Sequence, residues 1–406
     1  MPRPWPGGSR DFSMRSIELF AGCGGLALGL SQAGFLPVRL VEKDPASIAT
    51  INLNKQRGVA HASTWPVIET DATSLDYRGW RGQIDLVSGG PPCQPFSIGG
   101  KHLGPADARN LWPHAIRAVR EVRPKAFLFE NVRGLLRPDF DLYLRYIRLQ
   151  LAWPELGIER GETWRSHLRR LVRYSNDAGD EKSEYRVVLQ PLNTADYGAP
   201  QKRYRVIVLG IRRELGQALD VPATTHSQEA LAWSKHITKK YWRRHGFKNG
   251  KAASSTSEEY ALERARTGAV ARKKLPWVTV RDVLAGLPPP GEDPHLVAND
   301  RAILGARAYR NHTGSDLDEP AKALKAGDHG VPGGENMIAL PRGGVRYFTV
   351  REMARLQGFP AEFAIAGTWK AATRQLGNAV PVHVGVFFGD LLRKLIQDAG
   401  KVRVAA

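Results

Sequence analysis

Cys93 is one of only two cysteines in this 406-residue chain, and it stands between prolines in the stretch G-G-P-P-C-Q-P-F-S, residues 89–97. The mostly apolar run 84–87 comes just before it, so the thiol is expected past the end of a strand, where a substrate can reach it. Most lone cysteines are small buried hydrophobes. Here the glycines let the backbone turn and the prolines stiffen it, which favours a chemical role.

Two further sets of side chains could act with that thiol. Glu130 comes at the end of the next apolar run, so its carboxylate and the thiol are predicted to project into the same crevice. Arg203 and Arg205 are two residues apart in Q-K-R-Y-R-V, and on a strand they would share one face. Paired arginines are often only a solvated face. Beside a thiolate and a substrate phosphate, they would lower the thiol pKa and hold the substrate.

The sequence also contains residues suited to a nucleoside-bearing cofactor. The loop F-A-G-C-G-G, residues 20–25, removes side chains where a strand turns into a helix, but it lacks both G-K-[ST] and the G-x-G-x-x-G spacing. Glu42, about twenty residues later, ends the next apolar run, where an acidic residue commonly binds ribose hydroxyls. Asp71 could accept from an adenine amino group, although a turn-forming aspartate is an equally good interpretation. A nucleoside without a pyrophosphate fits this set.

The elements that must position these residues follow from a repeating pattern between Ser16 and Gly134. Short apolar runs alternate with helix-like stretches, which predicts a parallel sheet covered on both faces, with ligands at the carboxyl ends of its strands. Each run ends in a glycine, a carboxylate or the cysteine loop. The four runs are S-I-E-L-F-A-G, P-V-R-L-V-E-K-D, Q-I-D-L-V-S-G-G and K-A-F-L-F-E-N-V.

The rest of the chain has a different organisation. A helical insertion is expected at about 139–183, followed by two β-like runs around a turn within 184–213. Thr279 and Thr349 each precede an acidic residue by three positions, with glycine and proline about two turns later, so each predicts a capped short helix. A last helix, at about 382–396, carries an apolar stripe that indicates a core-facing side.

Composition narrows the classes of function. The net charge is +19, and the sequence pI is about 10.1, which favours a polyanionic partner such as nucleic acid over a merely soluble basic surface. No apolar run approaches the ~20 residues needed to cross a bilayer. Two widely spaced cysteines argue against a disulfide framework and a structural zinc site. The N-terminal stretch lacks the features of a secretory signal, so we expect a cytoplasmic protein.

A basic, serine-interrupted region lies between Ala230 and Lys274. Tyr241, Trp242 and Phe247 punctuate its lysines and arginines. Such a segment can follow a phosphate backbone and stack on bases. A solvated charge run is the equally weighted alternative.

Taken in order, these motifs resemble those of the DNA (cytosine-5)-methyltransferase family. Each motif is modest alone, but the ordered set is specific and spans nearly the whole chain. Ala379 departs from the serine found in many relatives, and Cys23 occupies a variable position, so it inherits no nucleophilic role. The motifs are F-A-G-C-G-G (20–25), V-E-K-D (41–44), G-G-P-P-C-Q-P-F-S (89–97), E-N-V (130–132), Q-K-R-Y-R-V (201–206), R-E-M-A-R-L-Q-G-F-P (351–360) and G-N-A-V-P (377–381).

The resemblance implies an α/β, Rossmann-like S-adenosylmethionine-dependent methyltransferase fold. Its sheet would be mostly parallel, with a second, smaller DNA-recognition domain. Within that second domain, the glycine-rich stretch 323–336 would be a recognition loop or only a surface turn. The expected divisions are a flexible tail at 1–13, a catalytic and cofactor-binding domain at 14–200, a target-recognition domain at 201–360, and a segment at 361–406 that returns to the catalytic domain.

The resemblance also implies roles for individual residues. The Cys93 thiolate would add to cytosine C6, while Glu130 engages N3 and the exocyclic amine and Asn131 positions the loop. The base must leave the duplex to reach the thiol, and no metal is required. The implied substrate contacts are Gln94, Ser97 and Asn131, with Arg203 and Arg205 near the phosphate or ring. The implied S-adenosylmethionine contacts are Phe20, Gly22, Gly24, Glu42, Asp71, Asn378 and Val380.

Two rival functions remain at this stage. One is a tRNA cytosine-5 methyltransferase, although the long basic region has no evident use in it. The other is a catalytically silent DNA-binding homologue, although the intact thiol and carboxylate argue against it. The resemblance favours a prokaryotic modification enzyme that acts as a monomer on double-stranded DNA, paired with a cognate restriction endonuclease that it does not bind directly. The target sequence cannot be derived, because base readout depends on loop geometry.

Overall fold

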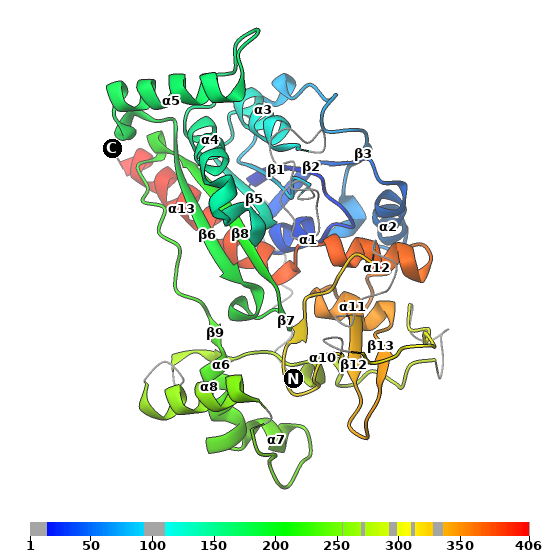
Figure 1. Ribbon diagram of the computed structural model, residues 1–406. Coiled ribbons are helices and arrows are strands. Elements are labelled where there is room, and N and C mark those ends of the chain that lie inside the picture. The colour runs from blue at the N-terminus through cyan, green and yellow to red at the C-terminus, as the bar shows by residue number, and fades with distance from the viewer. Residues whose placement is uncertain are drawn as a thin grey trace. The chain divides into compact units, whose positions relative to one another are not determined.

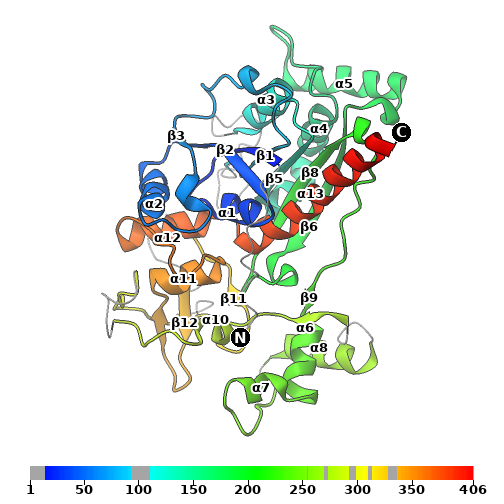
Figure 2. The same ribbon diagram turned by 180° about the vertical axis from the view of Figure 1, so that it is seen from behind.

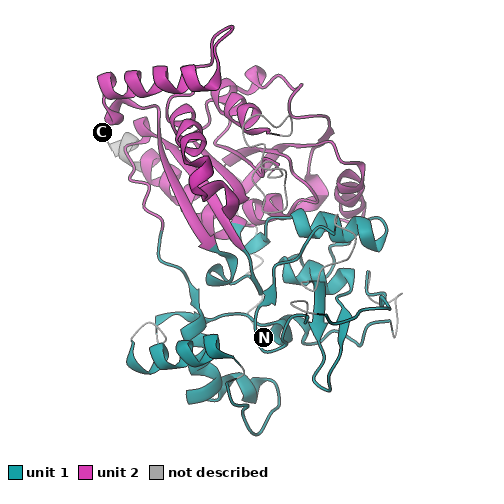
Figure 3. Ribbon diagram, viewed as in Figure 1, with its two compact units in different colours: residues 1–3, 193–203, 222–384 teal, residues 4–192, 204–221, 385–406 magenta. Residues whose placement is uncertain are grey.

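The computed structural model describes residues 14–92, 110–253, 255–268, 273–291, 299–309, 313–327 and 336–405. The chain forms two compact units (Figure 3). We call the first the sheet unit; it contains the described chain up to Leu192, Tyr204–Val221 and the residues from Gly385 onward. The second unit contains Asn193–Arg203 and Pro222–Val384. These boundaries differ from the expected divisions at 200 and 360. The strand that begins at Tyr204 pairs within the central sheet, and the second unit continues past residue 360 to Val384.

The sheet unit is built on one seven-stranded sheet, ordered β3-β2-β1-β4-β5-β8-β6 (Figure 1). The neighbours from β3 to β5 pair in parallel, and β8 runs antiparallel to β5. The expected mostly parallel, Rossmann-like sheet is therefore confirmed. The strands are β1 (Met14–Leu19), β2 (Phe35–Glu42), β3 (Val67–Glu69), β4 (Leu86–Gly89), β5 (Ala126–Val132), β6 (Tyr185–Asn193) and β8 (Tyr204–Arg212).

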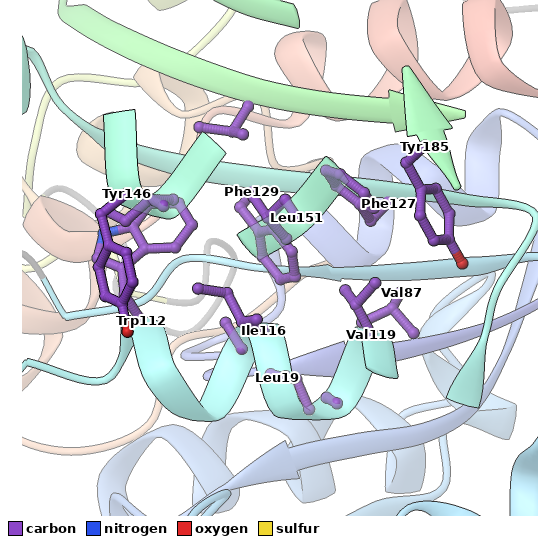
Figure 4. Packing of buried hydrophobic residues seen from close by; sticks show 14 of the residues in the cluster. Leu19, Val87, Trp112, Ile116, Val119, Phe127, Phe129, Tyr146, Leu151 and Tyr185 are labelled. Carbon is purple, nitrogen blue, oxygen red and sulfur yellow. The ribbon is translucent and has the colours of Figure 1, made fainter. Parts of the chain in front are cut away.

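Helices cover both faces of this sheet, as its nearly continuous apolar strands require. One face carries the helices α3, α4 and α5, and the other carries α1 and α13, as the two opposite views show (Figures 1 and 2). Figure 4 shows side chains of α3 packed against Phe127 and Phe129 of β5. The bounds are α1 (Gly25–Gln32), α2 (Pro45–Gln56), α3 (Trp112–Val122), α4 (Asp141–Ala152), α5 (Trp164–Ala178) and α13 (Val382–Ala405).

Helices occupy both the stretch expected as an insertion and the end of the chain. The helices α4 and α5 lie within the expected insertion, and α13 begins at the expected residue but continues to Ala405. Two glycines let α13 approach α1 closely. A β-carbon on Gly385 would lie 3.0 Å from the Gly29 Cα, and one on Gly389 would lie 2.6 Å from the Ala33 Cβ. This packing explains why the end of the chain returns to the sheet unit.

The second unit combines short helices with two-stranded pairings. Thr279 and Thr349 both form the predicted capping boxes, at α10 and α11. The helices are α6 (Gln228–Ala232), α7 (Lys240–Arg244), α8 (Thr256–Thr267), α10 (Val280–Leu284), α11 (Val350–Leu356) and α12 (Trp369–Asn378), with one π-turn at Trp233–Ile237. The paired strands are β7 (Gln201–Lys202) with β11 (Ala321–Lys322), β9 (His226–Ser227) with β10 (Leu275–Pro276), and β12 (Met337–Ala339) with β13 (Val345–Tyr347).

The aromatic residues of the basic region have a different place from the one predicted. Tyr241 and Trp242 are buried and pack with Leu231 and Trp277 in a small core. The base-stacking interpretation is therefore wrong for these two side chains, because each ring buries a large apolar area and the Tyr241 hydroxyl has hydrogen-bond partners in Thr279 and Asp318. Among the described residues, no helix combines the length and the hydropathy needed to span a bilayer.

Candidate active site at the carboxyl ends of the strands

The glycine-rich loop between β1 and α1 has a backbone that few other sequences could adopt. Phe20, Gly22 and Gly24 all have positive φ, at 55°, 54° and 91°. A β-carbon on Gly24 would lie 2.5 Å from the Trp65 ring, so a larger residue does not fit there. A β-carbon on Gly22 would meet no described atom within 4 Å. The Gly22 backbone therefore faces open space, which suits close approach by a ligand.

Glu42, at the end of β2, is held by three backbone amides. Its Oε2 accepts from the Gly22 N–H at 2.7 Å, and its Oε1 accepts from the N–H groups of Lys43 at 2.8 Å and Asp44 at 2.7 Å. These bonds fix the carboxylate against the glycine-rich loop. A carboxylate has further lone pairs available, so it can still accept from ribose hydroxyls.

Asp71 follows β3 and lies beside Lys43. The Lys43 ammonium donates to the Asp71 carboxylate at 2.7 Å, and this hydrogen bond, with one from the Thr73 amide, lowers the pKa of Asp71 to about 2. Asp71 is thus an ionised acceptor at neutral pH. Phe20, Gly22, Glu42 and Asp71 come from the ends of three adjacent strands, and two carboxylates in this set suit a nucleoside but would repel a pyrophosphate.

The remaining predicted cofactor residues belong to the second unit. Asn378 is the last residue of α12 and is exposed, whereas Val380 is buried two residues later. Cys23, in the glycine-rich loop, is buried, and burial raises the pKa of its thiol to about 12. A thiol so far from ionisation is a poor nucleophile, in agreement with the prediction that Cys23 has no such role.

The segment that leads to Cys93 is described as far as Pro92. Gly89 ends β4, and a β-carbon there would lie 2.3 Å from the Leu19 carbonyl oxygen, so the strand end needs glycine. Asn131 is completely buried, and its amide donates to the Pro91 carbonyl at 3.1 Å. Asn131 therefore anchors the base of the cysteine loop. Cys93, Gln94 and Ser97 lie outside the described residues.

Glu130 and Arg205 form an ion pair beside this loop. Glu130, near the end of β5, is only 8% exposed, and Arg205 Nε lies 2.6 Å from its Oε1. The two strands are neighbours, and their register places Arg205 opposite Val132. A β-carbon on Gly90 would lie 3.6 Å from Glu130 Oε2. The carboxylate thus lies between an arginine and the backbone of the loop that bears the thiol.

Arg203 does not share a strand face with Arg205, so that prediction is wrong. β7 ends at Lys202 and β8 begins at Tyr204, which leaves Arg203 between them. Arg203 is 2% exposed and donates to the carbonyls of Leu324 at 3.1 Å and Gly377 at 2.7 Å. A buried guanidinium requires such partners, and the carbonyls of two distant segments supply them.

Two glutamines beside Arg203 complete a buried hub that sequence reasoning missed. Gln201 donates to the Leu356 carbonyl and to Gln357 Oε1, and its own Oε1 accepts from the Leu324 amide. Gln357 in turn donates to the carbonyls of Leu376 and Ala379. Both glutamines stand inside quoted motifs, at buried positions where a polar side chain needs several partners. A glutamine inside a motif otherwise expected to pack in the interior was the signal in the sequence that could have identified them.

The glycine-rich stretch 323–336 has a fixed base. Asn336 is buried, and its side chain both accepts from the Lys325 amide at 3.0 Å and donates to the Lys325 carbonyl at 2.9 Å. These paired bonds close the two ends of the stretch on each other. Residues 328–335 lie outside the described part, so the predicted recognition loop itself is not tested.

Comparison with known proteins agrees with this arrangement. The model of the C-5 cytosine-specific DNA methylase family matches residues 14–152 and 176–393. The type II methyltransferase M.PspPI of Psychrobacter sp. is 30% identical over 403 residues, which cover 97% of this chain and 82% of that protein. M.NgoMIV of Neisseria gonorrhoeae is also 30% identical, over 94% of this chain and 98% of that protein.

Solved structures share the fold. A putative DNA modification methyltransferase encoded within an E. coli prophage superposes with a TM-score of 0.53 at 22% identity, over 95% of this chain and 100% of that one. The Dnmt2 methyltransferase of S. pombe gives 0.52 at 18% identity, over 94% and 99%. With a family match over most of its length and relatives at 30% identity, the chain belongs to the C-5 cytosine-specific DNA methylase family.

Proposed function

We propose that this chain transfers a methyl group to C5 of a cytosine extruded from a specific short sequence of double-stranded DNA, through a covalent adduct at Cys93. The observation that carries the proposal is the Glu130–Arg205 ion pair beside the anchored base of the cysteine loop. A buried carboxylate at this place can bind the polar edge of a pyrimidine, and the loop can present a thiol to its ring.

Cys93 is assigned the nucleophilic step. C5 of cytosine is a weak carbon nucleophile, and addition of the thiolate to C6 gives the ring enamine character. S-adenosylmethionine, when bound, supplies the methyl group. Loss of the C5 proton then returns the bonding electrons to the ring and expels the thiolate, so sulfur leaves with the pair it brought.

Glu130 is assigned the stabilisation of the substrate ring. Its carboxyl group would engage N3 and the exocyclic amine, where charge develops when sulfur adds to C6. Arg205 holds one carboxylate oxygen and leaves the other on the side of Gly90. Asn131, which donates a hydrogen bond to the Pro91 carbonyl, would fix the position of the loop relative to Glu130.

The residues around the glycine-rich loop fit the nucleoside end of S-adenosylmethionine. Glu42 would accept from the ribose hydroxyls and Asp71 from the adenine amino group, while Phe20 and Gly22 provide the loop surface. The open space at Gly22 is the feature that supports this assignment. Asn378 and Val380 keep their proposed cofactor contacts by family resemblance.

The biological role proposed is DNA modification in a restriction-modification system. The curated relatives are named type II methyltransferases, including M.Eco47II of Escherichia coli. In this role the enzyme would act as a monomer in a prokaryotic cytoplasm and would protect one short sequence from a cognate endonuclease that it does not contact.

The test is methylation followed by mapping. Purified protein is incubated with S-adenosylmethionine and unmethylated genomic DNA, and 5-methylcytosine is located by bisulfite sequencing. We expect modification confined to one short sequence. Transfer to tRNA alone would replace the proposal with the RNA enzyme, and no transfer to either would leave a silent homologue.

A second measurement isolates the nucleophile. A duplex with 5-fluorocytosine at the mapped site should form an adduct that survives SDS, because fluorine cannot leave as the C5 proton does. The Cys93→Ala variant should form none. An adduct of normal yield in that variant would show that another residue attacks C6.

A further inference from the structure

The helix α5 of the insertion has one buried face and one face of arginines. Leu168 and Leu171 belong to the main core, and the ring of buried His167 contacts the Leu156 carbonyl and the Tyr146 hydroxyl at 2.8 Å each. Arg165, Arg169 and Arg173 are all exposed, four residues apart, and so follow one stripe of the helix. The buried contacts hold this stripe toward solvent.

These three arginines are not neutralised by local acids. The nearby carboxylates of Glu162 and Glu159 pair instead with Arg170, at 2.7 Å and 3.4 Å. Within the described ranges, no ion pair joins Arg165, Arg169 or Arg173 to a carboxylate. Arg165 lies over the Trp164 ring at 4.8 Å, which restrains its guanidinium in advance of binding. A row of uncompensated cations therefore remains.

The neighbouring helix adds to this charge. Arg145 and Arg148 of α4 are also exposed and are one turn apart. The two helices pack through aromatic contacts, with the Tyr143 and Trp164 rings 5.5 Å apart and the Tyr146 and Trp164 rings 5.7 Å apart. Apart from the exposed Leu142 and Tyr174, the large apolar side chains of the two helices thus point inward, whereas these five arginines are exposed.

We propose that the α5 arginine face, Arg165, Arg169 and Arg173, binds the phosphate backbone of DNA without reading its sequence. The three residues span about 12 Å of helix at 1.5 Å per residue. The same length of duplex axis carries roughly seven phosphates at 1.7 Å per charge. Guanidinium groups match phosphate oxygens in geometry as well as charge.

Two observations favour DNA over an anionic lipid surface. The apolar face of α5 is already buried in the core, so the helix has no apolar stripe to insert into a membrane. The whole chain carries a net charge of +19, which extends attraction for a polyanion beyond one helix. The inference rests on the proposed function only in taking DNA as the substrate. It adds a contact that would raise the residence of the enzyme on long DNA while leaving turnover at the target unchanged.

The experiment measures how salt weakens binding to poly(dA)·poly(dT), a duplex that contains no cytosine and hence no target. The full-length triple variant R165Q/R169Q/R173Q is compared with the wild type between 50 and 200 mM salt. Each phosphate contact contributes about 0.9 to the slope of log K against log salt, so loss of three contacts should lower the slope by about 2 to 3. An unchanged slope would overturn the proposal.

Two matched variants separate the row from net charge and from side-chain shape. R165K/R169K/R173K keeps the charges and should keep the wild-type slope. R15Q/R57Q/K394Q removes three exposed charges dispersed over other elements of the sheet unit, and its slope should change by less than 1. An equal loss in the dispersed variant would show that only total charge matters, which also overturns the proposal. Unchanged melting temperatures exclude misfolding.

This design separates failure of the inference from failure of the proposed function. Binding to the cytosine-free duplex needs no methyl transfer, so the slope is informative even if the wild type proves inactive. Conversely, methylation by the wild type with an unchanged slope in the α5 variant would leave the function intact and remove the arginine face. A loss of tRNA binding with unaltered DNA binding would assign the face to RNA and overturn the DNA proposal.

Discussion

Arg203 and Arg205 stand two residues apart in one motif, yet they belong to different units and serve different partners. Arg205 lies in the central sheet and pairs with the carboxylate of Glu130. Arg203 belongs to the second unit and donates to two backbone carbonyls. The ion pair of Arg205 places two charged groups side by side in the sheet unit, whereas the hydrogen bonds of Arg203 connect two backbone segments of the second unit. The same type of side chain therefore belongs to the proposed active site at one position and joins backbone segments at the other.

The hydrogen bonds around Arg203 connect two segments that carry predicted functional residues. With Gln201 and Gln357, it joins the segment that leads into 328–335 to the end of α12, which carries Asn378. Gly377 allows this junction, because a β-carbon there would lie 2.4 Å from the Ala326 nitrogen. Any shift in this hub would displace the predicted recognition stretch and a predicted cofactor contact together.

The largest effect is expected for Glu130, the member of the ion pair that we propose binds the substrate ring. Glu130→Gln keeps the size of the side chain but removes its charge, so turnover should fall by roughly 10²- to 10⁴-fold, the range for loss of a positioned acid or base. Single-turnover methyl transfer at saturating DNA measures this. A loss of less than tenfold, with a normal melting temperature, would remove Glu130 from the chemistry.

The next effect concerns stability and belongs to Arg203. Arg203→Ala leaves two buried carbonyls without their donor, so the free energy of unfolding should fall by about 2 to 5 kcal/mol. Denaturant titration measures the loss, and adduct formation with the 5-fluorocytosine duplex counts the molecules that remain competent. Arg203→Lys should recover less than half, since an ammonium cannot bridge two carbonyls as a planar fork does. A stable Arg203→Ala protein with impaired turnover would reverse the comparison with Arg205.

A smaller change is expected for Arg205. Arg205→Ala should reduce single-turnover methyl transfer by roughly 10- to 100-fold, the equivalent of one charge-assisted contact of about 1.5 to 3 kcal/mol. Arg205→Lys retains the charge beside Glu130 and should restore part of that rate. Equal rates in the two variants would mean that the charge of Arg205 does not act through Glu130.

Sequence reasoning succeeded where one local pattern decides the outcome. Apolar runs that end in glycine or carboxylate marked β1, β2, β4 and β5, and the threonine caps marked α10 and α11. The short strand β3 was missed, because its three residues carry no periodic signal. The pattern could place Glu130 at a strand end, but it could not place the break between β7 and β8.

The failures share one physical cause, which is competition between distant segments. Arg203 lies outside the strand because carbonyls 121 and 174 residues away in the sequence accept hydrogen bonds from its guanidinium. Tyr241 is buried because its hydroxyl has hydrogen-bond partners, Thr279 and Asp318, inside a small core. No spacing rule within a motif contains such partners, so a charged or aromatic type alone did not determine exposure.

The last effect depends on pH and extends the comparison to Glu18, a buried carboxyl group for which the described residues provide no ion pair. Glu18 on β1 is 3% exposed, and burial, aided by the charge of Glu42, raises its pKa to about 8 from an ordinary 4.5. Between these values the folded protein retains a proton that the unfolded chain has released. The free energy of unfolding should therefore decrease as pH rises from 5 to 8, by at most about 1.36 kcal/mol per pH unit from this group.

Glu18→Gln tests this directly, because an amide of the same size does not titrate. Its free energy of unfolding should fall less steeply than that of the wild type between pH 5 and 8, so the variant gains relative stability toward pH 8. Denaturant titrations at four pH values measure both slopes, and all other titrating groups are shared by the two proteins. Parallel slopes would mean that Glu18 is ionised when folded and must have a cation partner, as Glu130 has in Arg205.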